Sequence, residues 1–194
     1  MSHYSKKELD SIGFKALGNN VLISKKASIY NAGNISLGSN VRIDDFCVIS
    51  AGNGGIFIGS NVHIAVYSSL IGAGEINLSD FSNISSKVSI YSSSDDYSGQ
   101  FMTSPMLPSQ YTNVNKAKVN IGKHVIIGCG SVILPGVEIK SGAAVGAMSL
   151  VDKDCEEFSI YAGVPARKIN NRSRKLVELE KEYLENVRHN DFKD

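Results

Sequence analysis

The chain has 194 residues, of which 42% are hydrophobic and 8% aromatic, and its 18 glycines and lack of tryptophan favour one domain with small interior side chains over a bulky globular core. A formal net charge of +1 gives no argument for nucleic-acid binding, and no apolar run approaches the roughly 20 residues of a membrane span. The opening MSHYSKKELDSIGF lacks the apolar segment of a secretory signal, and three cysteines at 47, 129 and 155 form neither a paired framework nor a CxxC metal pattern, so we expect a soluble, cytoplasmic protein without a metal.

The N-terminal segment predicts a short helix. Ser5 is followed three residues later by Glu8, the spacing of a capping box, within SKKELDSIGF. We assign residues 1–20 to an N-terminal cap that covers the exposed end of the structure that follows.

Residues 121–151 repeat with a period of six. Aliphatic residues stand at Ile121, Ile127, Ile133, Ile139, Val145 and Val151. A helix would place successive members about 120° apart, and a long flat strand would need alternation, so both are excluded. Short strands joined by corners fit instead: three units close a triangular coil of eighteen residues, and coils stack about 4.8 Å apart through parallel hydrogen bonds. The predicted fold is an all-β solenoid.

The same units occur earlier in the chain. They begin at Leu37, Ile58, Leu78, Ile121 and Ile139, with steps of 21, 20, 43 and 18 residues. The first two excesses over eighteen fall at the glycine-rich segments 52–55 and 72–74, where bulging turns are sterically easy. The third excess predicts an inserted loop.

We expect this loop at about residues 92–118, inside a β-helix domain that spans residues 21–170. The loop is rich in Tyr, Phe and Met, which is more apolar than a solvated linker needs, and long loops on rigid scaffolds often carry sites. Residues 171–194 are expected to form a C-terminal helix that caps the solenoid or contacts another subunit. Its apolar residues share one side: Leu176, Leu179, Tyr183, Leu184 and Val187.

The sequence resembles the hexapeptide-repeat acyltransferases over about residues 20–172. The resemblance rests on PGV at 135–137, AVGAMSLVDKD at 144–154 and YAGVPARKI at 161–169. It implies a left-handed parallel β-helix, a homotrimer with sites between subunits, and transfer of an acetyl group from acetyl-CoA. RIDDF at 42–46, HIA at 63–65 and IYSSSDDYSG at 90–99 are similar to sugar acetyltransferases of surface-polysaccharide pathways, in particular enzymes that acetylate dTDP-4-amino-4,6-dideoxyglucose.

Coenzyme A needs a groove of small residues for its pantetheine arm and basic groups for its phosphates. The candidates for the groove occupy adjacent coils: Gly128, Cys129, Gly146 and Ala147. Lys153 and Arg167 match positions that, by the resemblance, meet the nucleotide end. A solvated basic face is the alternative for these two residues.

Acetyl transfer needs an unprotonated nucleophile, and many family members place a histidine in the inserted loop. Here that place holds Asp95 and Asp96. A neighbouring carboxylate or burial could raise one pKa enough for general base catalysis, or the pair could orient a protonated amino sugar. The alternative is a loop turn in which the two aspartates only bind backbone amides.

His63 is the second candidate base or acceptor ligand. It takes the sixth, outward place of its unit, with Arg42 and Asn83 at the same place in neighbouring coils. The loop leaves from another corner, so His63 and Asp96 could meet only across a subunit boundary. His124 occupies a corner place and is expected on the surface.

These residues favour an acetyl-CoA-dependent N-acetyltransferase acting on a nucleotide-linked amino sugar, because an amine acceptor tolerates a missing histidine better than a hydroxyl does. The implied pathway is O-antigen or capsule biosynthesis. The alternatives are an O-acetyltransferase acting on a sugar hydroxyl and a non-catalytic solenoid scaffold.

Overall fold

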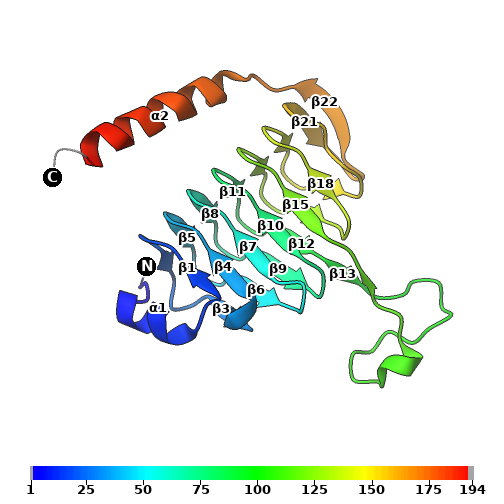
Figure 1. The fold of residues 1–194 in the computed structure, drawn as a ribbon. Helices are drawn as coiled ribbons and strands as arrows, with labels where there is room; N and C mark the ends of the chain where they lie inside the picture. The colour runs from blue at the N-terminus through cyan, green and yellow to red at the C-terminus, as the bar shows by residue number, and fades with distance from the viewer. Residues whose placement is uncertain (1, 192–194) are drawn as a thin grey trace.

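The computed structural model describes residues 2–191, with side chains for residues 2–187. The chain forms a parallel β-solenoid of about 7 turns with a short helix at each end (Figure 1). Three parallel sheets form its walls. The predicted left-handed parallel β-helix is confirmed. No helix among the described residues is long and apolar enough to cross a membrane.

Each of the first six coils contributes one short strand to each wall, and β21 and β22 at the C-terminal end extend the second sheet. The first sheet contains β1 (Ala16–Leu17), β4 (Ile35–Leu37), β7 (Ile56–Ile58), β10 (Ile76–Leu78), β15 (Val119–Ile121) and β18 (Glu138–Ile139). The second sheet contains β2 (Leu22–Ile23), β5 (Val41–Ile43), β8 (Val62–Ile64), β11 (Asn83–Ile84), β16 (Ile126–Ile127), β19 (Ala144–Val145), β21 (Ser159–Ala162) and β22 (Arg167–Asn171). The third sheet contains β3 (Ser28–Tyr30), β6 (Val48–Ala51), β9 (Ser69–Gly72), β12 (Ser89–Tyr91), β17 (Val132–Ile133) and β20 (Leu150–Val151).

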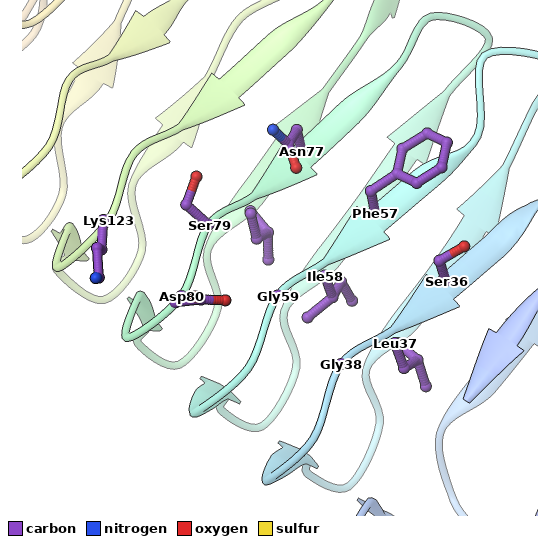
Figure 2. A pocket seen from close by; sticks show the side chains of 11 residues that line it. Ser36, Leu37, Gly38, Phe57, Ile58, Gly59, Asn77, Ser79, Asp80 and Lys123 are labelled. Atoms are coloured by element: carbon purple, nitrogen blue, oxygen red, sulfur yellow. The ribbon is translucent and has the colours of Figure 1, made fainter. Parts of the chain in front are cut away.

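The predicted register between coils is confirmed. In the first sheet Leu37 pairs with Ile58, Ile58 with Leu78, Leu78 with Ile121 and Ile121 with Ile139. Figure 2 shows the alternation along this sheet, with Phe57 on its outer side and Ile58 on its inner side. Each of the steps of 21, 20, 43 and 18 residues therefore corresponds to one coil, and the excess residues lie at corners or in the inserted loop.

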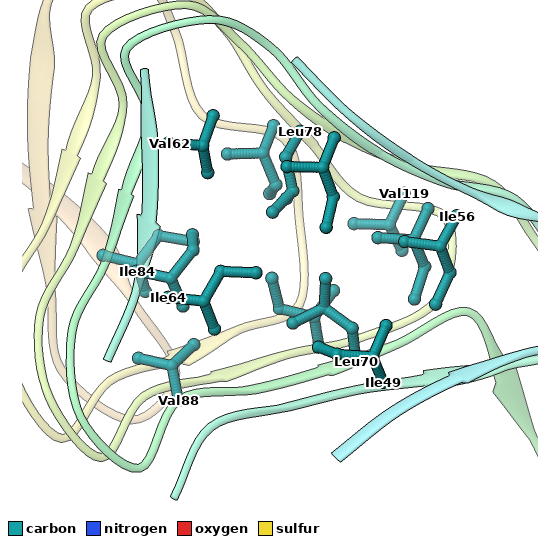
Figure 3. Packing of buried hydrophobic residues seen from close by; sticks show 14 of the residues in the cluster. Ile49, Ile56, Val62, Ile64, Leu70, Leu78, Ile84, Val88 and Val119 are labelled. Atoms are coloured by element: carbon teal, nitrogen blue, oxygen red, sulfur yellow. The ribbon is translucent and has the colours of Figure 1, made fainter. Parts of the chain in front are cut away.

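Aliphatic side chains from all three walls fill the interior (Figure 3). The largest of them, such as Ile64, Leu70 and Leu78, are fully buried. Each such side chain contributes roughly 1.5–3 kcal/mol relative to exposure. One interior column of the second sheet is almost entirely apolar and contains Val21, Val41, Val62, Ser82, Val125 and Ala143.

Three corners join the walls. We name them the first corner, between the first and second sheets; the second corner, between the second and third; and the third corner, which leads to the next coil. The first two contain non-glycine residues in the left-handed conformation. These are Asn20, Asn40, Asn61, Phe81, His124 and Phe158 at the first corner and Phe46, Tyr67, Lys87 and Met148 at the second. The inserted loop leaves the third corner and projects away from the solenoid (Figure 1).

Helix α1 (Lys6–Ile12) closes the N-terminal end. Its predicted capping box is confirmed: Ser5 Oγ accepts a hydrogen bond from the Glu8 backbone N at 3.3 Å, and the Glu8 carboxylate accepts one from the Ser5 backbone N at 2.7 Å. Leu9, only 4% exposed, packs onto the solenoid core.

Helix α2 (Lys175–Asp191) lies along the first corner. It begins later than residue 171 because residues 167–171 form β22, which pairs antiparallel with β21. The Glu180 carboxylate accepts hydrogen bonds from Lys123 Nζ and, at 2.7 Å, from His124 Nε2. His124 is thus covered by this helix rather than free on the surface, and 15% of its side chain is exposed. Residues 192–194 of the expected C-terminal segment lie outside the described residues.

Candidate functional site

The four candidate residues for the pantetheine groove meet at the second corner. Gly128 N donates to Val145 O at 2.7 Å and Gly146 N to Tyr161 O at 2.7 Å, which fixes the spacing of successive coils. A Cβ on Gly128 would lie 2.4 Å from Ala147 N, so the backbones approach as closely there as only glycine allows. Cys129 and Ala147 are exposed on the outer rim of this corner. The result is an accessible edge with little side-chain bulk.

Lys153 and Arg167 lie together at the C-terminal end of the solenoid. Both are exposed. Arg167 Nη1 donates to Asp152 Oδ1 at 3.3 Å and to Ala166 O at 2.7 Å, while 58% of its side chain stays accessible. Lys153 is adjacent in sequence to this aspartate. Positive charge is therefore available at the end of the coil that holds Gly146 and Ala147, and just beyond it.

His63 lies in the predicted outward row on the second sheet. Its neighbours across the strands are Arg42 and Asn83, as expected from the sequence. Its Nε2 is 2.9 Å from Asp44 Oδ2, and its Nδ1 is 3.2 Å from Asn83 Oδ1. Both ring nitrogens thus have partners within one chain. Asn83 Oδ1 and the Asp44 carboxylate both only accept, so both contacts are hydrogen bonds when both ring nitrogens carry a proton; in a ring with its proton on Nε2 alone, the lone pair of Nδ1 faces the Asn83 oxygen.

Asp44 was not among the residues that the sequence pattern identified. It is 5% exposed, and its other oxygen, Oδ1, accepts a hydrogen bond from Arg42 Nε at 2.7 Å. Burial by itself raises the pKa of this carboxyl, but the hydrogen bonds from His63 and Arg42 outweigh it and hold the pKa below its ordinary value. The only available signal was its place within RIDDF, because a buried partner of His63 is a long-range contact.

Asp95 and Asp96 stand at the base of the inserted loop. They follow β13 (Ser93–Ser94), which pairs antiparallel with β14 (Asn115–Lys116). Asp95 is exposed. The Asp96 carboxylate accepts hydrogen bonds from Ser98 Oγ at 2.9 Å and from Gly99 N at 3.1 Å, so it also closes a turn.

A single chain does not bring the two groups of candidates together. His63 lies on the second sheet, whereas the aspartate pair lies beyond the third corner. Farther out, the loop exposes apolar side chains, including 93% of Tyr97 and 89% of Met106. The loop also contains η2 (Ser109–Tyr111).

A further surface is hollow enough for a ligand. A groove of about 540 Å³ lies on the outer face of the first sheet and is lined by Phe57, Asn77, Asp80 and Lys123, among others (Figure 2). It contains none of the predicted site residues and lies on a different wall from His63 and the second corner. The described residues contain no group of three His, Cys, Asp or Glu side chains that could hold a metal ion.

No protein-family model matches the chain. A curated dTDP-4-amino-4,6-dideoxy-D-glucose acyltransferase of Escherichia coli is 57% identical over 180 residues, which cover 93% of this chain and 94% of that protein. WbbJ of E. coli K12, assigned to lipopolysaccharide biosynthesis as an O-acetyl transferase, is 33% identical over 77% of this chain and 79% of its own length.

Solved structures with a similar fold belong to the same kind of enzyme as these relatives. A variant of AntD, an N-acyltransferase from Bacillus cereus, in complex with dTDP-4-amino-4,6-dideoxyglucose and coenzyme A, superposes with a TM-score of 0.90 at 54% identity, covering 95% of this chain and 98% of that one. AntD with dTDP and 3-hydroxybutyryl-CoA gives a TM-score of 0.92 at 53% identity, covering 96% and 98%. The chain belongs to the hexapeptide-repeat acyltransferases, in the family of the sugar-nucleotide acyltransferases of which the E. coli protein and AntD are members.

Proposed function

We propose that the protein is an acetyl-CoA-dependent N-acetyltransferase whose acceptor is a dTDP-linked amino sugar, dTDP-4-amino-4,6-dideoxy-D-glucose. The observation that carries the proposal is the match over 95% of the chain to AntD bound to that amino sugar and coenzyme A. The reaction joins the amine nitrogen to the acetyl carbon, breaks the thioester bond and releases free coenzyme A with one proton from the amine.

Coenzyme A is assigned to the second corner and the C-terminal end. The pantetheine arm lies along Gly128, Cys129, Gly146 and Ala147, and its phosphates meet Lys153 and Arg167. The test is a Lys153→Ala, Arg167→Ala double variant, which should raise the KM for acetyl-CoA with little change in the KM for the amino sugar. An unchanged KM for acetyl-CoA rejects this assignment.

The active assembly is a homotrimer that meets through the outer face of the third sheet. Two outward columns cross that face without a charged residue: Ser28, Val48, Ser69, Ser89, Val132 and Leu150, and beside them Tyr30, Ser50, Ile71 and Tyr91. The second and third corners bound this face. A threefold axis in front of it places the second corner of one copy beside the third corner of the next.

This arrangement supports a site between copies. One copy supplies the coenzyme A groove and His63, and the next supplies Asp95 and Asp96 from its loop. Ser69→Lys should dissociate the trimer by light scattering and abolish turnover, whereas Ser36→Lys on the outer face of the first sheet is the matched control and should do neither. A stable trimer of the Ser69→Lys protein would contradict the proposed interface.

Asp96 or Asp95 accepts the proton of the amine, and His63 binds the acceptor. The contacts support this division, because both ring nitrogens of His63 face oxygen atoms of the same chain within 3.2 Å, whereas Asp95 is exposed. Asp95→Asn and Asp96→Asn, tested separately, should show one variant with at least about 100-fold lower kcat. His63→Ala should mainly raise the KM for the amino sugar; loss of kcat with normal KM would make His63 the base instead.

O-acetylation of a sugar hydroxyl is the second candidate, favoured by the match to WbbJ. Thiol release from acetyl-CoA, measured with dTDP-4-amino sugars and with free glycosides, separates the two. Reaction with hydroxyl acceptors alone overturns the proposal, and no thiol release with any acceptor would leave the scaffold alternative. Adding 3-hydroxybutyryl-CoA to the panel tests the acyl chain, since AntD was crystallised with it.

The proposed setting is the cytoplasm, on a pathway to O-antigen or capsule. Support comes from three free cysteines, two of them buried, which suit a reducing compartment. Deletion of the gene in its host, followed by sugar analysis of the surface polysaccharide, should remove an N-acetylated dideoxy sugar.

A further inference from the structure

The N-terminal half of the second corner carries an exposed aromatic pair. Phe46 and Tyr67 stack with ring centroids 4.9 Å apart and an interplanar angle of 15°. Lys26 Nζ lies 5.3 Å from the centroid of Phe46, on which it forms a cation–π contact. Yet 46% of Phe46 and 56% of Tyr67 remain exposed. Among the described residues, no ring or cation contact covers the second face of Tyr67.

The backbone at these positions makes the choice of side chains unusual. Phe46 has φ +60° and Tyr67 φ +62°, in the left-handed region that bulky residues rarely adopt and that asparagine tolerates. At the first corner, three coils use asparagine in this conformation. The aromatic exceptions there are Phe81, His124 and Phe158. Phe81 and His124 are covered by α2, with Phe81 in edge contact with Tyr183, and the Arg174 guanidinium lies over the Phe158 ring at 4.0 Å. Phe46 and Tyr67 have the same conformational cost, yet apart from the Lys26 contact on Phe46 both rings stay largely exposed.

The pair is aligned with the proposed coenzyme A groove. Backbone hydrogen bonds run along the corner from Tyr67 to Asp45, from Lys87 to Val66 and from Gly130 to Ser86, each joining one coil to its neighbour. With strands about 4.8 Å apart, Tyr67 lies two coils, or about 10 Å, from the Cys129–Gly130 turn. A sugar and a diphosphate can span that distance between a thioester and a stacked base.

The charges at the second corner suit a diphosphate that lies between the aromatic pair and the coenzyme A groove. Lys26 is already paired with Asp45 at 3.3 Å. Lys87, in the coil between Tyr67 and the groove, is exposed and forms no ion pair in the part of the chain that the structure describes. An unpaired lysine at this point offers a point charge to phosphate oxygens.

We propose that Phe46, Tyr67 and Lys87 form the subsite for the nucleotide half of the acceptor: a pyrimidine base stacks on Tyr67, and Lys87 contacts the diphosphate. The inference rests on the proposed function, which supplies a nucleotide-linked acceptor. It adds the direction in which that acceptor lies, with its base toward the N-terminal coils and its amine toward the thioester.

The test uses variants that the backbone tolerates. Tyr67→Asn and Phe46→Asn place the residue preferred at the first corner into the same conformation, so folding is retained while the stacking surface is lost. Phe57→Leu is the matched control, because Lys15 lies 5.1 Å from the Phe57 ring on the opposite side of the solenoid, outside the proposed site. Lys87→Ala completes the set.

Tyr67→Asn should raise the KM for the nucleotide sugar and the Kd for dTDP alone about tenfold, with the KM for acetyl-CoA unchanged. Lys87→Ala should weaken dTDP binding and reduce its dependence on salt. Phe57→Leu should change neither constant. Calorimetric titration with dTDP gives the Kd without turnover, so its outcome is independent of which acceptor group is acetylated.

Normal dTDP affinity in the Tyr67→Asn and Lys87→Ala proteins overturns the inference, and if wild-type turnover with the amino sugar persists, the proposed function survives that result. Loss of the trimer in Tyr67→Asn, detected by light scattering, also overturns it, because the aromatic pair would then be a subunit contact. Absence of amino-sugar turnover in the wild type, with tight dTDP binding that needs Tyr67, would reject the proposed function and keep the subsite.

Discussion

The interior column that contains Ser82 gives a prediction about stability. Ser82 is 1% exposed, and its hydroxyl has no hydrogen-bond partner among the described residues. The equivalent positions in the two adjacent coils are Val62 and Val125, each 1% exposed. We therefore expect Ser82→Val to stabilise the protein, because the cross-section of the solenoid at this level already accommodates valine.

The expected gain in the free energy of unfolding has two contributions. An unsatisfied buried hydroxyl costs about 1–3 kcal/mol, which the substitution recovers. The additional methyl group buries apolar surface worth about 0.8 kcal/mol, reduced by any crowding in the column. A net gain of about 2 kcal/mol should raise the Tm of a chain of this size by about 4–8 °C.

Thermal unfolding followed by circular dichroism tests the prediction, with two companion variants. Ser82→Ala removes the hydroxyl without adding volume and should stabilise by about 1 kcal/mol. Ser131→Ala is the matched control: Ser131 is equally buried, but its hydroxyl donates to Gly146 O at 2.9 Å, so its loss should lower the Tm. A lower Tm for both Ser82 variants would refute the reasoning, since the hydroxyl would then be making a stabilising contact.

Three further predictions concern acid stability, the C-terminal helix and coil stacking. Burial alone would raise the pKa of Asp44, but hydrogen bonds from its histidine and arginine partners hold this pKa below the usual value. The contribution of Asp44 to the stability of the fold is therefore complete above a pH of about 4 and is lost as the pH falls through the lower pKa of the folded state. Asp44→Asn should remove this slope from a plot of Tm against pH. Glu180→Gln weakens the acceptor for Lys123 and His124 and should increase hydrogen exchange in α2 at least about fivefold while the core strands stay protected. Unchanged exchange in α2 would show that apolar contacts alone hold the helix on the solenoid. Gly128→Ala places a Cβ 2.4 Å from a backbone nitrogen of the next coil and should cost about 3 kcal/mol or more, whereas Gly33→Ala, whose Cβ meets nothing nearer than 4.0 Å, should change the Tm little; equal effects would contradict the close approach.

Local rules allowed the sequence to predict the solenoid and its register. The interior of each coil is filled by residues a few positions apart, and each coil stacks only on its neighbours, so a period of six and the steps from Leu37 to Ile139 carry the information. The capping box of α1 is equally local, since Ser5 and Glu8 are three residues apart. The outward row of Arg42, His63 and Asn83 followed from the same counting.

Contacts that depend on long-range packing were decided only by the tertiary structure. His124 has the sequence signature of a surface corner residue, but Glu180, 56 residues away, brings α2 over it. The partner of His63 proved to be Asp44, nineteen residues earlier, and this contact orients the ring through Nε2. The stacking of Phe46 on Tyr67 likewise requires two corners to coincide in three dimensions. Periodicity specifies which residues share a wall, but the side-chain partners above that wall depend on where helices and loops return, which no repeat encodes.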